Sequence, residues 1–338
     1  MIRSLIAFAA GVLLTLGVVA AQRFTREVPD SPLASPAASA AARAVRETMA
    51  PHIASLLTGG IEKKRAILDE HFYGPKIEEA RRLYPVRESA GEIAGVYVET
   101  FEPIGGPSPG NERRVLINLH GGAFEVGART EGRLESIPVA HVAGMRVVSV
   151  DYRQGPEHRF PAASEDVAAV YRALLADHAP GQIGIFGCSA GGMLTAQSLA
   201  WFDAHDLPQP GAAGIFCAGA GEFGAGDARV IGAAFGASGG GSEIAYLADV
   251  DWRDPLVAPI HHPKLLERFP PTLVITSTRD GALSSAAATH QRLRAAGTTA
   301  ELHVFEGLPH YFFADTGLPE SREVFARTAE FFDRHLAR

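Results

Sequence analysis

A serine lies between two glycines in the segment Gly187-Cys188-Ser189-Ala190-Gly191, directly after the apolar run Ile183–Phe186 and before a helical pattern. A strand, a sharp turn and a helix in this order present a serine hydroxyl above the edge of a sheet as a nucleophile. Gly187 and Gly191 fit such a turn, because the backbones that flank its tip leave little room for side chains. For this motif alone, an ordinary glycine-rich turn with an incidental serine is the alternative interpretation.

A serine hydroxyl is a weak nucleophile at neutral pH, so it needs a base, a group that orients the base, and donors for the developing oxyanion. The glycine-rich segment Leu119-His120-Gly121-Gly122-Ala123-Phe124 follows the apolar run Val115–Leu119. Free backbone N–H groups in a loop at the end of a strand are suited to bind an oxyanion. The predicted donors are the N–H groups of Gly122, Ala123 and Ala190. His120 and Gly121 are expected to support the loop, with the His120 imidazole bracing it through hydrogen bonds.

A third segment is Asp151-Tyr152-Arg153-Gln154-Gly155-Pro156-Glu157-His158-Arg159-Phe160-Pro161-Ala162-Ala163. With the two glycine-rich motifs, it makes the chain resemble the hormone-sensitive-lipase-like (bacterial family IV) esterases of the α/β-hydrolase superfamily. Members of that family carry His-Gly-Gly-Gly, Tyr-Arg-Leu-Ala-Pro-Glu-His-Pro-Phe-Pro-Ala-Ala and Gly-Asp-Ser-Ala-Gly-Gly in this order. The resemblance runs from about Val115 to the C-terminus. It implies an α/β-hydrolase fold with a helical cap and a serine carboxylesterase that acts through an acyl-enzyme intermediate.

The resemblance also implies that an acid and then a histidine follow the serine along the chain. Asp280 ends the strand-like segment that contains Leu273–Thr276, which is where the family places its acid. His310 follows a later apolar run in Gly307-Leu308-Pro309-His310-Tyr311, a segment that resembles the family's Gly-Met-Pro-His-Gly-Phe. We therefore predict that Asp280 orients His310 and that His310 takes the proton of Ser189.

Other acids and histidines fit these roles less well. Asp249, Asp251 and Asp254 lie upstream of Asp280, but none of them ends a strand-like run. The pair His261-His262 lacks Cys, Asp or Glu at metal-ligand spacing, so we expect a loop there. The sequence predicts neither a metal nor a cofactor.

Three positions depart from the family's motifs. Ala123 replaces the third glycine, which keeps the N–H but narrows the loop and demands a backbone conformation that alanine tolerates. Cys188 replaces the acidic residue before the serine, and we expect its thiol to pack away from Ser189 rather than act as a nucleophile. Tyr311 stands where relatives often have glycine, and its ring is expected to restrict the pocket. The prediction is a preference for short acyl chains.

The elements that must position these residues begin at about Ile93. Short apolar runs alternate there with helical patterns, which indicates an α/β protein with a mainly parallel sheet and helices on both faces. The expected strands are Val96–Phe101, Val115–Leu119, Val147–Val150, Ile183–Phe186, Ile215–Cys217, Leu273–Thr276 and Leu302–Phe305. The expected helices are Phe160–Ala176, Met193–His205, Ala286–Ala296 and Ser321–Leu336.

The helical patterns that precede this region are Ala40–Leu57, Ile61–His71 and Ile77–Leu83, with breaks at Gly59-Gly60 and Gly74-Pro75. We predict a helical cap segment over residues 40–92 and a catalytic domain over residues 93–338. By resemblance, a glycine-rich insertion around residues 219–262 completes the cap over the active site. Phe124, Phe223 and Phe235 are candidate pocket walls, and core packing explains each of them equally well.

At the N-terminus, Arg3 precedes the apolar run Leu5–Ala21, and Val19-Ala20-Ala21 offers a cleavage point. We predict that residues 1–21 form a signal peptide, with an uncleaved membrane anchor as the alternative. Residues 22–39, rich in Pro, Ser and Ala, are a predicted linker. The protein is then exported, either periplasmic or secreted, or it is anchored to the membrane only through residues 1–21.

Composition limits the remaining functions. The 338 residues are 46% hydrophobic, enough for a sizeable core. The formal charge of −7 comes without long blocks of one sign, which argues against nucleic acid as a partner. Cys188 and Cys217 are expected to be buried free thiols.

The predicted partner is a small-molecule ester, and the sequence leaves open whether the protein forms a homodimer. Alternative functions are the same machinery on lactones, acetylated sugars or amides, and a non-catalytic binding module.

Overall fold

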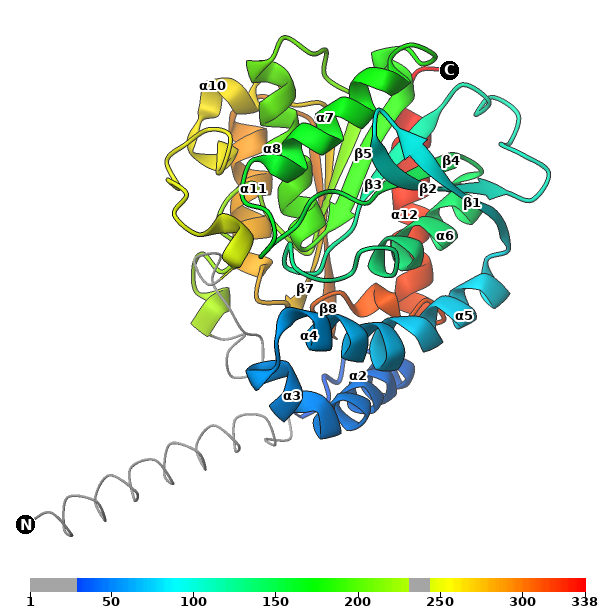
Figure 1. Cartoon of the computed structure of the whole chain (residues 1–338), viewed down its shortest axis with the longest axis vertical. Helices are drawn as coiled ribbons and strands as arrows, with labels where there is room; N and C mark the ends of the chain where they lie inside the picture. Colours follow the sequence, from blue (N-terminus) through cyan, green and yellow to red (C-terminus); the bar gives the residue numbers. More distant parts are fainter. Residues whose placement is uncertain (1–28, 231–243) are drawn as a thin grey trace, which may run out of the picture.

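An eight-stranded sheet with the strand order β1-β2-β4-β3-β5-β6-β7-β8 forms the centre of the molecule (Figure 1). This computed structural model describes residues 29–230 and 244–338. The strands are β1 (Val86–Ile93), β2 (Val96–Pro103), β3 (Val115–Leu119), β4 (Arg146–Val150), β5 (Ile183–Cys188), β6 (Ala212–Phe216), β7 (Thr272–Arg279) and β8 (Ala300–Pro309). Strands β3 to β8 are parallel, whereas β2 is antiparallel to both β1 and β4. The predicted α/β class and all the expected strands are confirmed.

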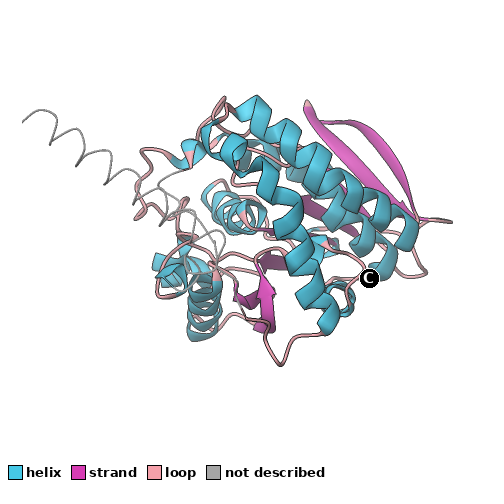
Figure 2. Cartoon of the chain, turned by 90° about the horizontal axis from the view of Figure 1, so that it is seen from below, coloured by secondary structure: helices cyan, strands magenta, loops and turns pink. Residues whose placement is uncertain are grey.

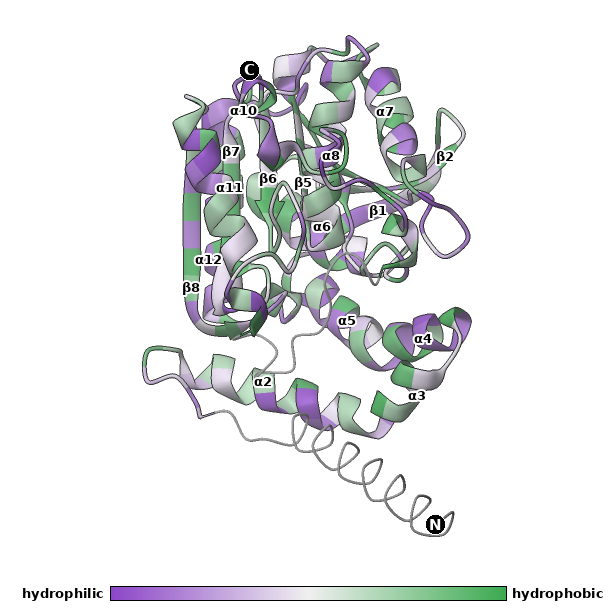
Figure 3. Ribbon diagram, turned by 90° about the vertical axis from the view of Figure 1, so that its left-hand side faces the viewer, coloured by the Kyte–Doolittle hydropathy of each residue, from purple (hydrophilic) through white to green (hydrophobic). Residues whose placement is uncertain are grey.

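The central strands are buried on both faces, which explains their nearly uninterrupted apolar sequences. Every residue of β3, β5 and β6 is buried, and Figure 3 shows hydrophobic colours along β5 and β6. Successive side chains alternate between two cores: Ile183 and Ile185 belong to one, Phe186 and Cys188 to the other. The sheet is therefore a middle layer that needs helices on each side.

Helices supply both outer layers, as Figure 1 shows. One face is covered by α7 (Ala162–Leu174), α8 (Ala190–Ala204) and α11 (Leu283–Ala295), and the other by α6 (Glu131–Ala143) and α12 (Pro319–His335). The remaining short elements are α10 (Pro263–Leu266) and 3₁₀ turns at Pro180–Gln182, Ala245–Leu247, Pro259–His261 and Phe312–Ala314. Among the described helices, none has both the length and the apolar character needed to cross a membrane.

Strand β1 and helix α6 were not expected from the sequence. β1 is an edge strand with six consecutive exposed residues, so it has no hydrophobic alternation. It joins β2 through a turn at Ala94 and Gly95, both with positive φ. Residues 86–92 therefore belong to the sheet, and their assignment to the helical cap was wrong. Helix α6 is buried around most of its circumference, so its sequence lacks an amphipathic pattern. It also contains Pro138, which is unusual inside a helix.

The segment before β1 is helical, as predicted, with different bounds. Its helices are α2 (Pro36–Met49), α3 (Ile53–Thr58), α4 (Ile61–Leu68) and α5 (Gly74–Leu83), with a 3₁₀ turn at Ala50–His52 and a π-helical turn at Asp69–Tyr73. Helix α2 starts inside the predicted linker, because Ser35 caps it: the Ser35 Oγ accepts the N–H of Ala38 at 3.0 Å. Gly74-Pro75 does not break the chain into separate helices, since proline is tolerated in the first turn of α5.

These N-terminal helices lie across one end of the sheet, as Figure 1 and the view from below in Figure 2 show. It is the end at which the serine after β5 meets side chains from α4 and the π-helical turn. The predicted signal peptide, Phe235 and part of the predicted cap insertion lie outside the described residues. The described cap thus comes mainly from residues 36–83.

Candidate active site

Ser189 occupies a tight turn between β5 and α8, with φ 57° and ψ −120°. A positive φ is unusual for a residue with a side chain, and it points the hydroxyl away from both elements. A Cβ at Gly187 would lie 2.1 Å from the carbonyl oxygen of Leu119, and a Cβ at Gly191 would lie 1.7 Å from the same atom. Both positions therefore require glycine, for the crowding reason that the sequence suggested.

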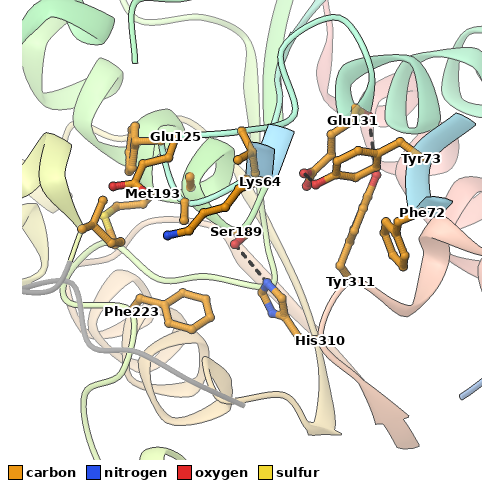
Figure 4. A pocket seen from close by; sticks show the side chains of 16 residues that line it. Lys64, Phe72, Tyr73, Glu125, Glu131, Ser189, Met193, Phe223, His310 and Tyr311 are labelled. Atoms are coloured by element: carbon orange, nitrogen blue, oxygen red, sulfur yellow. Dashed lines mark hydrogen bonds between the residues drawn. The ribbon is translucent and has the colours of Figure 1, made fainter. Parts of the chain in front are cut away.

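The structure brings the three predicted residues of the acid–base relay together. The hydroxyl of Ser189 donates to Nε2 of His310 at 2.9 Å (Figure 4). In turn, Nδ1–H of His310 donates to Oδ1 of Asp280 at 2.8 Å. Asp280 directly follows β7, and His310 directly follows β8. Because β5, β7 and β8 are parallel, their carboxyl ends meet at one edge of the sheet.

The groups around Asp280 keep its carboxyl group ionised. Its side chain is only 2% exposed, Oδ1 accepts the N–H of Ala282 at 2.8 Å, and Oδ2 accepts the hydroxyl of Thr276 at 3.1 Å. Burial raises the pKa of Asp280, but the charge of His310 and these hydrogen bonds outweigh burial and leave the pKa below its usual value. Asp280 is thus a carboxylate at neutral pH.

The pKa of His310 is shifted in the opposite direction. Burial lowers it, but the negative charge of Asp280, the hydrogen bond to Asp280 and the charge of Glu131 raise it above the ordinary histidine value. An imidazole with a raised pKa is a stronger base, although it must still be neutral to accept the Ser189 proton.

The predicted oxyanion donors line the same pocket as Ser189. The N–H groups of Gly122, Ala123 and Ala190 donate no hydrogen bond to any other described residue. Gly122 and Ala123 have φ values of 90° and 55°, in the region that favours glycine. A Cβ at Gly122 would lie 2.2 Å from the carbonyl oxygen of Val126, whereas Ala123 is exposed and lines the pocket.

His120 lies behind this loop and is almost completely buried. Its Nδ1–H donates to the carbonyl of Gly121 at 2.8 Å, and its ring stacks on Tyr152 with centroids 4.3 Å apart. The Tyr152 hydroxyl donates to the His120 carbonyl at 2.6 Å. His120 therefore has the contacts that a bracing role requires.

Ser189 and His310 open onto a pocket of about 580 Å³ (Figure 4). Three of its lining residues, Lys64, Phe72 and Tyr73, come from the N-terminal segment of the cap. The others surround the relay: Gly122, Ala123, Phe124, Glu125, Val126, Glu131, Ser189, Ala190, Met193, Phe223, Ile244, His310 and Tyr311. The pocket is a cleft between the cap and the end of the sheet, where a small ligand would meet both.

Phe124, Phe223 and Tyr311, the predicted pocket residues that the structure describes, differ in their surroundings. Phe223 stands edge-on to His310, with centroids 5.1 Å apart and an angle of 89°, so it borders both the pocket and the base. Tyr311 has φ 54°, a conformation that favours glycine, and its ring packs against Phe313. Phe124 is fully buried and stacks on Tyr246 at 4.7 Å, so its ring serves mainly core packing.

Sequence reasoning missed Glu131, the first residue of α6. It is buried, lines the pocket and accepts the Tyr73 hydroxyl at 2.7 Å. Burial raises its pKa to about 7, against the opposing effects of Tyr73 and His310. A Cβ at Gly121 would lie 2.1 Å from Oε1 of Glu131, which explains the glycine there. No motif signals Glu131, because its role depends on the packing of α6.

The residue that replaces the family's acid, Cys188, is a buried free thiol, as is Cys217. Burial raises the pKa of the Cys188 thiol well above its usual range, and both Glu131 and Glu135 of α6 add to that shift. Two carboxyl groups of α6 thus stand near the position where the motif lacks one. Glu135 accepts a hydrogen bond from Asn118 at 2.9 Å, and burial raises its pKa well above the usual range.

Cys217 lies close to the relay. Its sulfur, a carboxylate oxygen of Asp280 and a ring nitrogen of His310 are all within 4.8 Å of one another. Burial raises the pKa of the Cys217 thiol to about 11, so the thiol keeps its proton at neutral pH. The nearest atoms of Asp280 and His310 already bond to each other. Packing is the role that these contacts support for Cys217.

Comparison with known proteins gives a consistent set of relatives. A family model described as alpha/beta hydrolase fold matches residues 116–314. An acetyl-hydrolase of Streptomyces hygroscopicus is 33% identical over 243 residues, which cover 64% of this chain and 76% of the relative. An esterase of Acinetobacter venetianus is 25% identical, covering 76% of this chain and 86% of the relative.

Solved structures extend the similarity over nearly the whole fold. The crystal structure of an esterase named E25 has a TM-score of 0.76 and 32% identity, covering 92% of this chain and 99% of that one. The structure of an esterase from the bacterial hormone-sensitive lipase family has a TM-score of 0.77 and 27% identity, covering 90% and 99%.

Proposed function

Because this chain belongs to the α/β-hydrolase fold family, in its hormone-sensitive-lipase group, we propose that it hydrolyses short-chain carboxylic esters with Ser189 as the nucleophile. The observation that carries this proposal is the continuous hydrogen-bonded chain from Ser189 through His310 to Asp280, open to a pocket of about 580 Å³.

The mechanism follows from the positions of these groups. His310 Nε2 takes the proton of Ser189 as the serine oxygen attacks the ester carbonyl carbon, and Asp280 stabilises the imidazolium. The tetrahedral oxyanion accepts hydrogen bonds from Gly122, Ala123 and Ala190. When the intermediate collapses, His310 returns the proton to the leaving alcohol. Water, activated by the same imidazole, then releases the acid from Ser189. None of these steps requires a cofactor.

The walls of the pocket support a preference for short acyl chains. Lys64 and Glu125 carry charges on the lining, and an alkyl chain passing them would remove water from both. The Phe223 and Tyr311 rings occupy space beside His310. One relative is named an acetyl-hydrolase, and this name supports acetyl esters as substrates among the short-chain esters.

The test is a series of p-nitrophenyl esters from acetate to decanoate, hydrolysed by the protein without residues 1–21 and by its Ser189→Ala variant. We expect kcat/KM to be highest for the short esters and to fall by about 10⁴ or more in the variant. Preference for decanoate over butyrate, or substantial activity of Ser189→Ala, would contradict the proposal. If no ester is turned over, covalent labelling of Ser189 by a fluorophosphonate would separate a specialised acyl substrate from a binding module.

We also propose that the protein is exported, on the support of Arg3 and the apolar run Leu5–Ala21. Cell fractionation of the full chain, with mass spectrometry of its N-terminus, tests this. A mature chain that starts at Gln22 supports cleavage, and an intact chain in the membrane fraction supports the anchor. An intact chain in the cytoplasmic fraction would overturn export.

A further inference from the structure

The ammonium group of Lys64 enters the pocket from the cap. Lys64 lies on α4, and Figure 4 shows its amino group pointing into the space between the cap and the sheet. The side chain is half-buried, and it makes no hydrogen bond or ion pair with any other described residue. A cation in a partly enclosed pocket that pairs with no described anion can bind a negative group of a ligand.

The next residue explains why Lys64 is held there. Arg65 binds Glu157 through two nitrogens at 2.7 and 2.9 Å, and it donates to the carbonyls of Glu125 at 2.8 Å and Gly155 at 3.0 Å. These four hydrogen bonds fix α4 against the core. The base of the Lys64 side chain is therefore positioned by its neighbour, which leaves the ammonium group available to a ligand.

Three other titratable groups line the pocket with Lys64: Glu125, Glu131 and His310. Glu125 uses Oε1 to accept the N–H of Ala245 at 3.1 Å, and no ion pair joins its carboxylate to Lys64 among the described residues. Glu131 is buried and its carboxyl group accepts the Tyr73 hydroxyl, whereas the second carboxylate oxygen of Glu125 has no described hydrogen-bond partner. Glu125 is therefore the acid freer to weaken the field of Lys64, and it is the control that any test must include.

We propose that Lys64 binds a carboxylate of the substrate, so that the preferred substrates are small esters that carry a second, ionised carboxyl group a few bonds from the scissile ester. This inference rests on the proposed function and names its substrate class. The carboxylate would belong either to the acyl part, as in the half-ester of a dicarboxylic acid, or to the alcohol part. In both cases it forms a charge-assisted hydrogen bond with the ammonium group, which changes affinity by about 10- to 100-fold.

The experiment compares charged esters with neutral esters of similar length. Monoethyl glutarate against ethyl hexanoate tests the acyl side, and 4-acetoxybutanoate against pentyl acetate tests the alcohol side, with acid release followed by titration. We expect the charged ester to have a kcat/KM at least about tenfold above its neutral partner in one of the two pairs. The pair that shows the preference identifies the side on which the carboxylate lies.

Variants on the same helix then assign the preference to one residue. Lys64→Met should bring the charged-to-neutral ratio of kcat/KM to about one, and Lys64→Arg should retain most of it. Lys63 is exposed on α4 and absent from the pocket lining, so Lys63→Met is the matched control and should keep the wild-type ratio. Glu125→Gln should raise the ratio, because it removes the competing carboxylate.

Two results would overturn the inference: equal turnover of charged and neutral esters by the wild-type protein in both pairs, or equal losses for charged and neutral esters in Lys64→Met. Failure of the proposed function looks different. In that case even p-nitrophenyl acetate is not hydrolysed, or its hydrolysis does not depend on Ser189. The acetate measurement therefore separates the two failures.

Discussion

Two walls enclose the pocket, and they are built differently. The wall on the sheet side consists of turns that directly follow parallel strands of the central sheet, so Ser189, Asp280 and His310 are fixed by the sheet itself. The wall on the cap side consists of Lys64, Phe72 and Tyr73, on α4 and the π-helical turn after it. Polar contacts such as those of Arg65 help to hold the cap side on the core.

This difference indicates that catalysis and substrate selection depend on different parts of the molecule. Residues whose positions must be accurate to a few tenths of an ångström are attached to strands of the central sheet. Residues that would contact the rest of the substrate are attached to elements with fewer buried contacts, where substitution costs less stability. Changes to the sheet wall should therefore affect all esters alike, and changes to the cap wall should affect some esters more than others.

The largest expected effect comes from Asp280→Asn in the sheet wall. The amide has nearly the shape of the carboxylate, but it lacks the charge that stabilises the His310 imidazolium and sets its tautomer. We expect kcat to fall by about 10⁴. The decrease should be the same for p-nitrophenyl acetate and hexanoate, with the melting temperature measured alongside as a check on folding. A loss that depends strongly on acyl length would show that the two walls are not separable.

The sheet wall is also the part of the site that the sequence revealed. Ser189 and Asp280 directly follow the buried strands β5 and β7, and His310 directly follows the edge strand β8, so a short motif and an apolar run are enough to place them. The glycines of the serine turn were predictable for the same reason, because their crowding involves neighbours in the same turn and strand β3. A short stretch of sequence indicates a strand and the turn after it. Because Ser189, Asp280 and His310 all lie in such turns, a short stretch was enough to identify each of them.

The cap wall could not be predicted in this way. Lys64 and Tyr73 reach the pocket only because α4 and the π-helical turn pack across the end of the sheet, and this packing depends on residues far along the chain, such as Glu157. Glu131 was missed for the same reason, since α6 is buried on most sides and its sequence resembles neither an amphipathic helix nor a motif. β1 was missed because an exposed edge strand needs no apolar residues.

The second prediction concerns Glu131, which accepts a hydrogen bond from Tyr73 and so links the sheet wall to the cap wall. His310 must be neutral to accept a proton, and the charge of Glu131 contributes to its raised pKa. Glu131→Gln removes that charge, so the pKa of His310 should fall, and the acid limb of the pH profile of kcat/KM should move to lower pH. We expect a shift of less than about one pH unit, because Asp280 is the larger influence.

The matched control is Glu125→Gln, which changes a carboxylate of the same pocket that does not contribute to the shift of His310. Its acid limb should coincide with that of the wild-type protein. If Glu131→Gln leaves the limb in place, or moves it to higher pH, then Glu131 does not act on His310 through its charge. Such a result would remove the electrostatic link between the walls.

The smallest expected effect comes from Phe72 in the cap wall. Phe72 borders both the main pocket and a second cavity of about 110 Å³, whose lining includes Ala38, Ala41, Ala42 and Val45 of α2. His310 and Tyr311 also border both spaces, so Phe72 is the shared residue that belongs to the cap. Phe72→Ala should connect the two spaces and give longer acyl chains an apolar place to bind. Each newly buried methylene contributes about 0.8 kcal/mol, or roughly fourfold in affinity. We expect the hexanoate-to-acetate ratio of kcat/KM to rise by about two- to tenfold.

Two companion variants decide whether the second cavity is responsible. Ala42→Leu, added to Phe72→Ala, fills that cavity and should bring the ratio back toward the wild-type value. Leu57→Ala, on the 66% exposed Leu57 of α3, changes the same cap outside the pocket lining and should leave the ratio unchanged. If Phe72→Ala instead lowers acetate and hexanoate turnover in parallel, the cap wall supports the relay itself, and the division between chemistry and selection does not hold at Phe72.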